Sequence, residues 1–556
     1  MQLKGTLKSF PGTYWVVIMF EFFERGAYYG MMSFLSVYLT ENLGFAKESV
    51  GIIKGTIQPL LYFLPIISGA IADRFGYRRT LMIAFALLGS GYFLTSQMTT
   101  YSAVFLALVV MGIGAGTFKP IISGSIARTT NQENSTMGFG IYYWSINLGA
   151  FLFPLILVPW LKNSDVFGPK WVIIASAICT GIMIIPTIFI FKEPENKVSG
   201  KSASTSLIQT IANAFEIIYS PFILIFHAFR KTFATRIIII LVTVLIASAG
   251  LFLFIKMGHT LTLFIVLLFL MTMITMLLQR SYTGSTNARK IALISIVLLC
   301  GATLWVLPGI SMFARFIMSI IYLTLLSLFL IEFDDIPKYV DHSHFLLMIF
   351  IYSGFWVLYF QMFDSVLWYM NDFVDASSVD RLVNGLFAGR INFKFDVEHV
   401  TVINAGTIIL LQILISHLVK NTKALPTMIT GIIFATVGMA ILAISTNIWV
   451  FIAGIFMFSI GEMTAHPKFI SYVGLTAPKD RVATYMGYIF LYGVIGSSIG
   501  AVLGANLYVH FVDNLNQPRI LWLFFSGIGV ITISGLLLYN RIIGNREIAM
   551  TNSTSI

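Results

Sequence analysis

The sequence predicts an all-helical protein that crosses a membrane many times, as two bundles of six helices with about four further helices inserted between them. Its 556 residues are 57% hydrophobic and only 11% charged, whereas soluble domains have about 25% charged residues. Apolar runs of the roughly 20 residues that a helix needs to cross a bilayer follow one another almost from end to end. One polar, basic segment near the middle separates the two halves.

The first bundle is predicted over residues 1–191. Apolar runs separated by short loops predict its six spans, which we place near residues 13–40, 50–72, 80–97, 101–127, 137–161 and 171–191. The first run contains Glu21, Glu24 and Arg25 and lacks a small-residue cleavage site. We therefore interpret it as a helix that stays in the chain and not as a signal peptide.

The remainder of the chain divides into a linker, an insertion and a second bundle. A basic cytoplasmic linker is predicted over 192–236, and inserted helices with a following loop over 237–343, with apolar runs near 237–255, 260–278, 291–307 and 311–331. The second bundle is predicted over 344–556, with spans near 344–370, 399–418, 427–445, 448–473, 483–510 and 520–540 and an outer loop at 371–398. The sequence does not indicate what the insertion does.

The net charge of +11 does not indicate a nucleic-acid partner, because no basic stripe with interleaved aromatic residues is present. Placing both termini in the cytoplasm puts most of the 35 lysines and arginines on that side, as the positive-inside rule requires. Of these lysines and arginines, only Arg25 and Lys119 then fall within helices. This topology favours a multi-pass protein of a bacterial inner (plasma) membrane. No metal or cofactor is expected, since Cys179 and Cys300 lie far apart in apolar runs.

The loop after the second span reads GAIADRFGYRR at residues 69–79. It resembles the loop motif of the major facilitator superfamily, whose fold has two six-helix halves and a substrate site near the midplane between them. The resemblance implies that Asp73 and Arg74 take part in conformational gating and not in substrate contact. The alternative is an ordinary positively charged cytoplasmic loop.

Ionisable residues inside membrane spans are costly and are functional candidates by default. Glu21, Glu24 and Arg25 lie three and four residues apart, so they can share one helix face. Two carboxylates beside one guanidinium leave one acid able to take up a proton. The alternative is a structural ion-pair cluster that holds the first helix. Lys119 and Glu462 carry opposite charges in opposite halves, and they form either a gate that opens and closes or two separate local pairs.

The segment EFFERGAYYG at residues 21–30 resembles the first-helix signature of the proton-dependent oligopeptide transporters. Both six-helix halves carry further similar stretches, namely YFLP at 62–65, GTFKP at 116–120, YYWSINLG at 142–149, Phe355-Trp356 with Gln361, Asn404, and GEMTAHP at 461–467. The insertion is not covered by the resemblance. The family commonly has two inserted helices, so four would be a departure.

The resemblance implies a role for each matching residue. Glu21 and Glu24 would handle protons, and Arg25 and Lys119 would meet a peptide carboxylate. Glu462 and Asn147 would meet the amino terminus. The substrate pocket would be lined by aromatic residues, with further polar residues of the second half beside them: Tyr28, Tyr29, Tyr62 and Trp356, with Asn404 and His466.

Several positions depart from the family pattern. Met32 and Phe360 stand where the family carries an arginine and a glutamate, and losing both partners leaves no orphan charge. Ile489 stands where the family tends to have tryptophan. His466 replaces a serine, and it either titrates and tunes Glu462 or is a hydrogen-bonded helix residue. Asp364, one turn beyond Phe360, is either a displaced acid or, as we expect, a residue of the outer rim.

We therefore predict a proton-coupled symporter that imports di- and tripeptides or a closely related small zwitterion by alternating access. The alternatives are a proton-coupled transporter of a non-peptide carboxylate or amino-acid-derived solute, and a non-transporting membrane scaffold. No nucleophile–base spacing, metal cluster or phosphate loop indicates an enzyme, so no catalytic residue is assigned.

Overall fold

The computed structural model describes residues 9–131, 134–194, 220, 336–390, 392–477, 485–486 and 488–541. The predicted linker and inserted helices lie almost wholly outside these residues, as do the side chains of Asp73 and Arg74. By its internal contacts the chain divides into two units, residues 1–214 with 347–556, and residues 215–346. The first unit contains every residue of the candidate site.

The first half is built from helices that satisfy their own backbone hydrogen bonds, as a chain in lipid must. They are α2 (Gly12–Met32), α3 (Leu35–Val37), η1 (Tyr38–Asn42), α4 (Lys47–Phe75), α5 (Tyr77–Gln97), α6 (Tyr101–Thr129), α7 (Ser135–Leu152), η2 (Phe153–Leu157), α8 (Val158–Lys162), α9 (Lys170–Gly181) and α10 (Ile184–Phe189). Gly76 joins α4 to α5 with a φ of 91°, a conformation that glycine adopts without strain.

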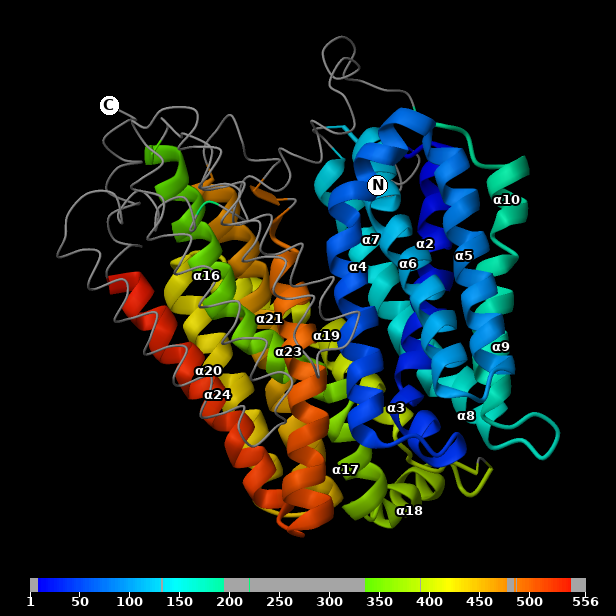
Figure 1. Cartoon of the computed structure of the whole chain (residues 1–556), viewed down its shortest axis with the longest axis vertical. Coiled ribbons are helices and arrows are strands. Elements are labelled where there is room, and N and C mark those ends of the chain that lie inside the picture. The colour runs from blue at the N-terminus through cyan, green and yellow to red at the C-terminus, as the bar shows by residue number, and fades with distance from the viewer. Residues whose placement is uncertain are drawn as a thin grey trace, which may run out of the picture. The chain divides into compact units, whose positions relative to one another are not determined.

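The second half repeats this pattern. Its helices are α16 (Ile336–Phe360), η3 (Gln361–Phe363), α17 (Ser365–Phe373), α18 (Ser377–Leu386), α19 (Glu398–Val419), α20 (Ala424–Leu442), α21 (Ile448–Thr476), α23 (Leu491–Tyr508), η4 (Val509–Asn514) and α24 (Pro518–Tyr539). Among the described residues, ten helical runs are long and apolar enough to cross a membrane. The predicted all-helical membrane fold is confirmed, and Figure 1 shows the two sets of helices.

Two predicted spans are not continuous. The first breaks after Met32, where Ser33 and Phe34 separate α2 from α3, and the seventh breaks after Phe360. No proline or glycine stands at either break. At the first break Ser33 bonds to Gly30 and Tyr29 of its own helix. At the second, the Phe363 carbonyl oxygen accepts hydrogen bonds from the other half, described below.

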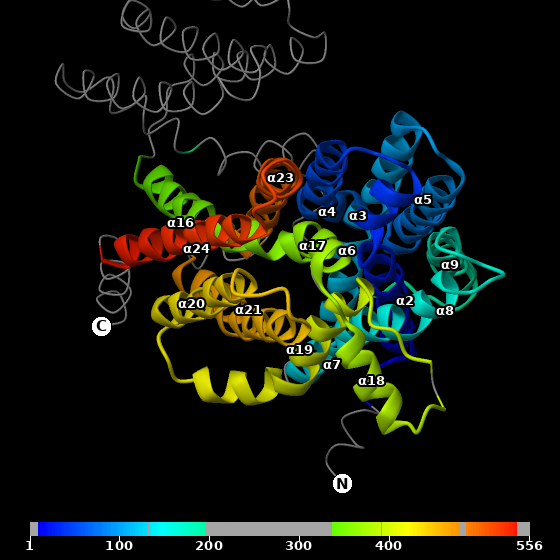
Figure 2. The same cartoon turned by 90° about the horizontal axis from the view of Figure 1, so that it is seen from below.

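The two halves contact each other mainly through α4 against α23 and α7 against α19, which lie side by side in Figure 2. Small residues allow the first of these approaches. A Cβ atom on Gly51 would lie 2.6 Å from the Cβ of Ala505 and 2.9 Å from the carbonyl oxygen of Ala501, and one on Gly55 would lie 2.9 Å from Val502. Glycines four residues apart are a common device for close helix packing in membranes.

We expect Gly51→Val to destabilise the protein by about 1–3 kcal/mol, the usual cost of overpacking, because part of the clash is with backbone that cannot rotate away. The measurement is the apparent unfolding temperature in detergent. Gly527→Val is the control, since a Cβ on Gly527 would meet nothing within 4 Å. Equal unfolding temperatures for the two variants would contradict the assigned contact.

Candidate functional site

The acidic cluster of the first helix is buried, with Glu21, Glu24 and Arg25 each at most 4% exposed. Arg25 lies 3.6 Å from Glu21 through Nε and 2.5 Å from Glu24 through its guanidinium. Within the described part of the chain, Oε2 of Glu21 and Oε1 of Glu24 have no hydrogen-bond partner. Two buried carboxylates thus share one guanidinium, as the spacing predicts, and each keeps an oxygen at which a proton could bind.

Lys119 lies on α6, in the same half of the molecule. Its Nζ is 4.4 Å from the centre of the Tyr62 ring on α4, a cation–π contact. It interacts electrostatically with Glu21 and Glu24 without a direct ion pair among the described residues. The first half therefore presents two cations, Arg25 and Lys119, close to its two acids.

Glu462 lies on α21 in the other half. Its Oε2 accepts a hydrogen bond of 3.0 Å from Nδ2 of Asn404 on α19, and the same amide donates to Ser459 at 2.9 Å. In the described structure, Glu462 and Lys119 do not form an ion pair. A pair that forms in another conformational state stays a prediction.

Aromatic side chains connect these two charged regions. Tyr62 from the first half lies 6.4 Å from Trp356 and 6.1 Å from Tyr492, measured between ring centres, and Trp356 stacks on Tyr492 at 4.4 Å. Tyr28 and Tyr29 lie edge to face at 5.3 Å on α2. The aromatic residues named from the sequence therefore come from both halves.

His466 belongs to the same group, one turn beyond Glu462 on α21. Its ring lies 5.2 Å from that of Trp356, and Nδ1 is 3.3 Å from the hydroxyl of Tyr352. This position is compatible with both sequence-based interpretations, a titrating group and a hydrogen-bonded helix residue. Asn147 donates to the carbonyl of Tyr143 on its own helix at 2.9 Å, so its predicted contact with a substrate would require a change of partner.

The sequence analysis missed a buried ion pair between Lys54 on α4 and Asp364, each 1% exposed. Nζ of Lys54 also donates to the carbonyl oxygen of Phe363 at 2.5 Å and to Oγ of Ser36 at 2.8 Å. Oγ of Ser36 lies 2.8 Å from the Phe363 carbonyl oxygen and 2.9 Å from Oδ1 of Asp364. We call Ser36, Lys54, Phe363 and Asp364 the outer latch.

The outer latch corrects two expectations. Asp364 was expected at the outer rim, with a displaced acid as the alternative, and it lies at the outer end but is buried. Lys54 belongs with Arg25 and Lys119 as a cation within a helix. One signal was available, because a lysine seven residues into a 29-residue helix lies beyond its first turn. Its partner could not be identified, since Asp364 is 310 positions away in the chain.

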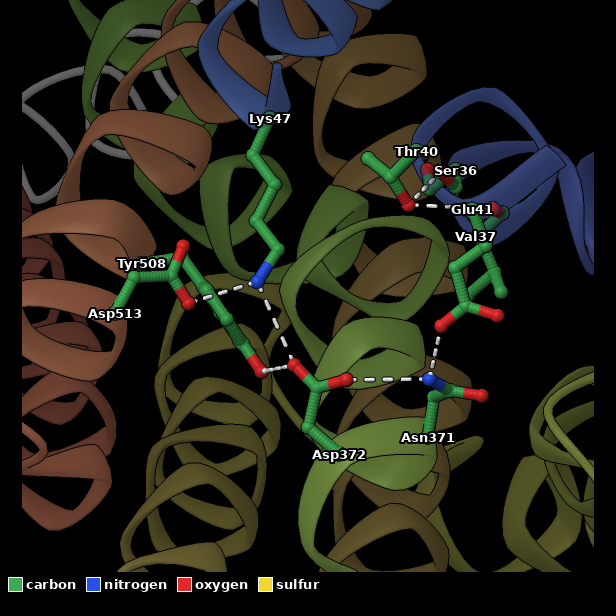
Figure 3. A network of polar contacts seen from close by, with 9 residues as sticks. All are labelled: Ser36, Val37, Thr40, Glu41, Lys47, Asn371, Asp372, Tyr508 and Asp513. Atoms are coloured by element: carbon green, nitrogen blue, oxygen red, sulfur yellow. Dashed lines mark hydrogen bonds and ion pairs between the residues drawn. The ribbon is translucent and has the colours of Figure 1, made fainter. Parts of the chain in front are cut away.

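The outer latch belongs to the end of the molecule that the predicted topology places outside, which we call the outer end and which carries the loops at 43–46, 163–169, 374–397 and 515–517. Lys47 there pairs with Asp513 at 2.8 Å and with Asp372 at 3.4 Å. Asp372 also accepts a hydrogen bond from Tyr508 at 2.8 Å. Figure 3 shows this network, together with the contact of Asn371 with Glu41.

A third lysine joins the halves at the outer end. Lys162, the last residue of α8, lies 2.5 Å from Glu398 and 2.9 Å from Asp396. Burial raises the pKa of Asp396, but the charge and hydrogen bond of Lys162 outweigh it and bring that pKa below its ordinary value. The Lys162–Asp396 bond is therefore fully present above about pH 4, the ordinary aspartate value, and is lost only as pH falls through the lowered pKa.

We expect Lys162→Met to lower stability by about 3–5 kcal/mol, because it leaves the fully buried Glu398 without its cation. Lys47→Met is the matched control, since its partners are 32% and 38% exposed and exposed pairs are worth at most about 1 kcal/mol. Apparent unfolding temperatures in detergent provide the comparison. If Lys162→Met unfolds no earlier than Lys47→Met, the assigned role of Lys162 is wrong.

The ion pairs that Lys47, Lys54 and Lys162 form between the two halves all lie at the outer end. Lys119 in the first half and Glu462 in the second carry opposite charges, and in the described structure they contact Tyr62 and Asn404 and do not pair with each other. The described residues contain no group of three His, Cys, Asp or Glu side chains that could hold a metal ion. The described ion pairs thus join the two halves at the outer end.

Comparison with known proteins gives three findings. A family model described as Major Facilitator Superfamily matches residues 15–334 and 345–548. Dipeptide and tripeptide permease B of Aliivibrio fischeri is 28% identical over 204 residues, which is 36% of this chain and 40% of that protein. The permease B of Salmonella typhimurium is 31% identical over 162 residues, 28% of this chain and 32% of that protein. The matched part thus spans less than half the length of these relatives.

Solved structures show the same fold over nearly the whole chain. A peptide transporter POT in complex with sulfate superposes with a TM-score of 0.62 at 17% identity, covering 97% of this chain and 95% of that one. A POT family transporter in complex with 5-aminolevulinic acid gives a TM-score of 0.60 at 19% identity, covering 97% and 100%. The resemblance that the motifs indicate is confirmed by these relatives and neighbours.

Proposed function

The chain belongs to the Major Facilitator Superfamily, and from this premise we propose that it is a proton-coupled symporter for di- and tripeptides or a closely related small zwitterion. The sequence relatives bear the name of dipeptide and tripeptide permeases. One solved neighbour holds a thioalcohol-conjugated peptide and another 5-aminolevulinic acid. 5-Aminolevulinic acid carries the amine and the carboxylate that such a site would recognise.

One observation carries the proposal: cationic and anionic side chains lie on opposite halves, and Lys119 and Glu462 do not pair with each other in the described structure. Arg25 and Lys119 supply cations in the first half, and Glu462 supplies an anion in the second. A solute with a carboxylate at one end and an ammonium at the other can bridge them, and it then draws the two halves together. Tyr62 and Trp356 between the charges offer aromatic faces for varied side chains.

The proton would be carried by the first-helix acids. With both carboxylates ionised, the single guanidinium of Arg25 is shared between Glu21 and Glu24. A proton on either acid frees part of the positive field of Arg25 for a substrate carboxylate. Proton binding and substrate binding then favour each other, which is the reciprocity that coupled transport needs. We place both termini in the cytoplasm and the outer end outside an inner membrane.

The replaced pair at Met32 and Phe360 favours a second candidate, a peptide-like solute that is not an ordinary nutrient peptide. Both side chains are buried, at 3% and 2% exposure, and Phe360 lies 6.0 Å from Tyr62 between ring centres. Phe360 therefore places an apolar ring beside Tyr62, at a position where the family carries a charged residue. A cell-wall fragment, an amino-acid derivative or another carboxylate would be such a solute.

The test is uptake of labelled dialanine by purified protein in liposomes, with and without an inward proton gradient. Accumulation that requires the gradient supports the proposal. If dialanine does not accumulate, but a gradient-dependent proton influx follows addition of other amino-acid derivatives or carboxylates, the second candidate replaces the first. If the folded protein moves neither protons nor solutes, the scaffold function is the remaining alternative.

A further inference from the structure

The outer loop at 371–398 contains a helix, α18, whose polar side faces its own loop. The side-chain amide of Asn384 exchanges two hydrogen bonds with the backbone of Phe393, at 2.7 and 2.8 Å. Oδ1 of Asp380, one turn earlier, accepts a hydrogen bond of 2.7 Å from the backbone N–H of Phe395. The polar groups that a surface helix normally presents to water are thus used within the loop.

The apolar side of α18 is exposed. Leu382, Leu386 and the following Phe387 are 51%, 75% and 55% exposed, and Val379 is the one buried residue of the helix. Leu382 and Leu386 lie four residues apart, so they share a helix face. A helix of ten residues is too short to be stable in water unless its apolar face is packed against something. The described residues of the chain do not provide that covering surface.

Both ends of this segment are attached beside exposed tryptophans. Asp375, just before α18, forms a backbone bridge with the residue two positions before Trp449, which is 47% exposed. Asp396, just after the residues that α18 holds, pairs with Lys162, and Trp160, two positions before that lysine, is 62% exposed. Tryptophans of membrane proteins gather where lipid meets water. The two attachments therefore hold α18 at the outer boundary of the bilayer, and Figure 2 shows it at the margin of the helices.

Two exposed arginines accompany the apolar face. Arg381 lies within α18, and Arg390 lies four residues after its end. Neither forms an ion pair among the described residues. Basic residues beside an apolar helix face are typical of helices that lie on an anionic lipid surface. The charges and the apolar side chains thus fit the same partner, which is lipid with acidic headgroups.

We propose that α18 lies on the outer surface of the bilayer, with its exposed apolar side chains among the outermost acyl carbons and its two arginines at anionic headgroups. The polar side of α18 holds the residues that lead to Asp396, and Asp396 pairs with Lys162 of the first half. The helix therefore connects a contact between the two halves to the membrane surface. This inference does not depend on the proposed transport function.

The first test uses the full chain in liposomes of phosphatidylcholine and phosphatidylglycerol, with both cysteines replaced and one new cysteine that carries a fluorophore. At Leu386→Cys we expect quenching by lipids brominated near the headgroup and protection from iodide in the water. At Ala46→Cys, an exposed position next to Lys47 between the halves, we expect quenching by iodide and not by the lipids. The proposal is overturned if iodide alone quenches the label at Leu386, or if neither quencher reaches it, as under a second copy of the chain.

Hydrogen exchange of the α18 amides gives a second test that needs no label. Exchange should be about tenfold slower in bilayers with phosphatidylglycerol than in phosphatidylcholine alone, because anionic lipid attracts basic residues. The double variant Arg381→Gln with Arg390→Gln should lose this difference, and Leu382→Ser with Leu386→Ser should exchange fast in both lipids. Leu515→Ser, the same change at an exposed leucine of another outer loop, should leave α18 unaltered. The proposal is contradicted if the double leucine variant exchanges no faster than Leu515→Ser, or if the arginine variant keeps the lipid difference.

Discussion

The Glu24→Gln variant is expected to equilibrate dialanine across a liposome membrane but not to accumulate it. Glutamine has the shape of the protonated acid and cannot release a proton, so the cluster with Arg25 stays in its proton-loaded charge state. A gradient of one pH unit provides about 1.4 kcal/mol per proton, which corresponds to a tenfold concentration ratio. The unaltered protein should approach that ratio, and the variant should stop near a ratio of one.

An exchange assay and a control variant distinguish loss of proton coupling from loss of folded protein. Exchange of labelled for unlabelled dialanine at equal concentrations should persist in Glu24→Gln, because exchange needs no net proton movement. Glu48→Gln is the matched control, since Glu48 lies in the first turn of α4 outside the cluster. Accumulation by Glu24→Gln equal to that of the control would show that Glu24 carries no coupled proton.

The second large effect is expected at Glu462. If this carboxylate holds the ammonium group of a peptide, Glu462→Gln should weaken dialanine binding by about 10- to 100-fold, the range for a hydrogen bond to a charged group. The same substitution should hardly change binding of N-acetyl-dialanine, which has no ammonium group. Isothermal titration with both ligands and both proteins forms a double-mutant cycle that isolates the contact.

The other half of the site gives the complementary comparison. Lys119→Gln should weaken the binding of dialanine but not the binding of its C-terminal amide. The reason is that Nζ of Lys119, which contacts Tyr62, would bind the substrate carboxylate. If Glu462→Gln weakens the binding of dialanine and of N-acetyl-dialanine to the same extent, Glu462 does not bind the amino group. The orientation of the substrate between the two halves would then have to be revised.

The fold was predictable because lipid permits few structures. A chain in a bilayer must bond its backbone within helices, so long apolar runs translate directly into spans. The four-residue spacing of Glu21 and Arg25 likewise predicts that they share a helix face and can form an ion pair. The structure places them 3.6 Å apart. These features depend on neighbours along the chain, which a single sequence contains.

Features that depend on contacts between the two halves were not predictable. The breaks after Met32 and Phe360 contain no helix-breaking residue, and at the second break the Phe363 carbonyl oxygen finds its partners across the interface. Lys54 was visible as a lysine inside an apolar helix, but nothing local indicates Asp364 as its partner. Lys119 and Glu462 show a further limit, since one sequence can support different pairings in different conformational states.

The most direct test of coupled symport is a pH-sensitive dye enclosed in liposomes that contain the purified protein, with equal pH on both sides at the start. We predict that adding dialanine outside will acidify the interior, and that Glu24→Gln will abolish this signal while leaving dialanine exchange intact. Entry of dialanine without internal acidification would contradict the account, because the solute would then cross without a proton.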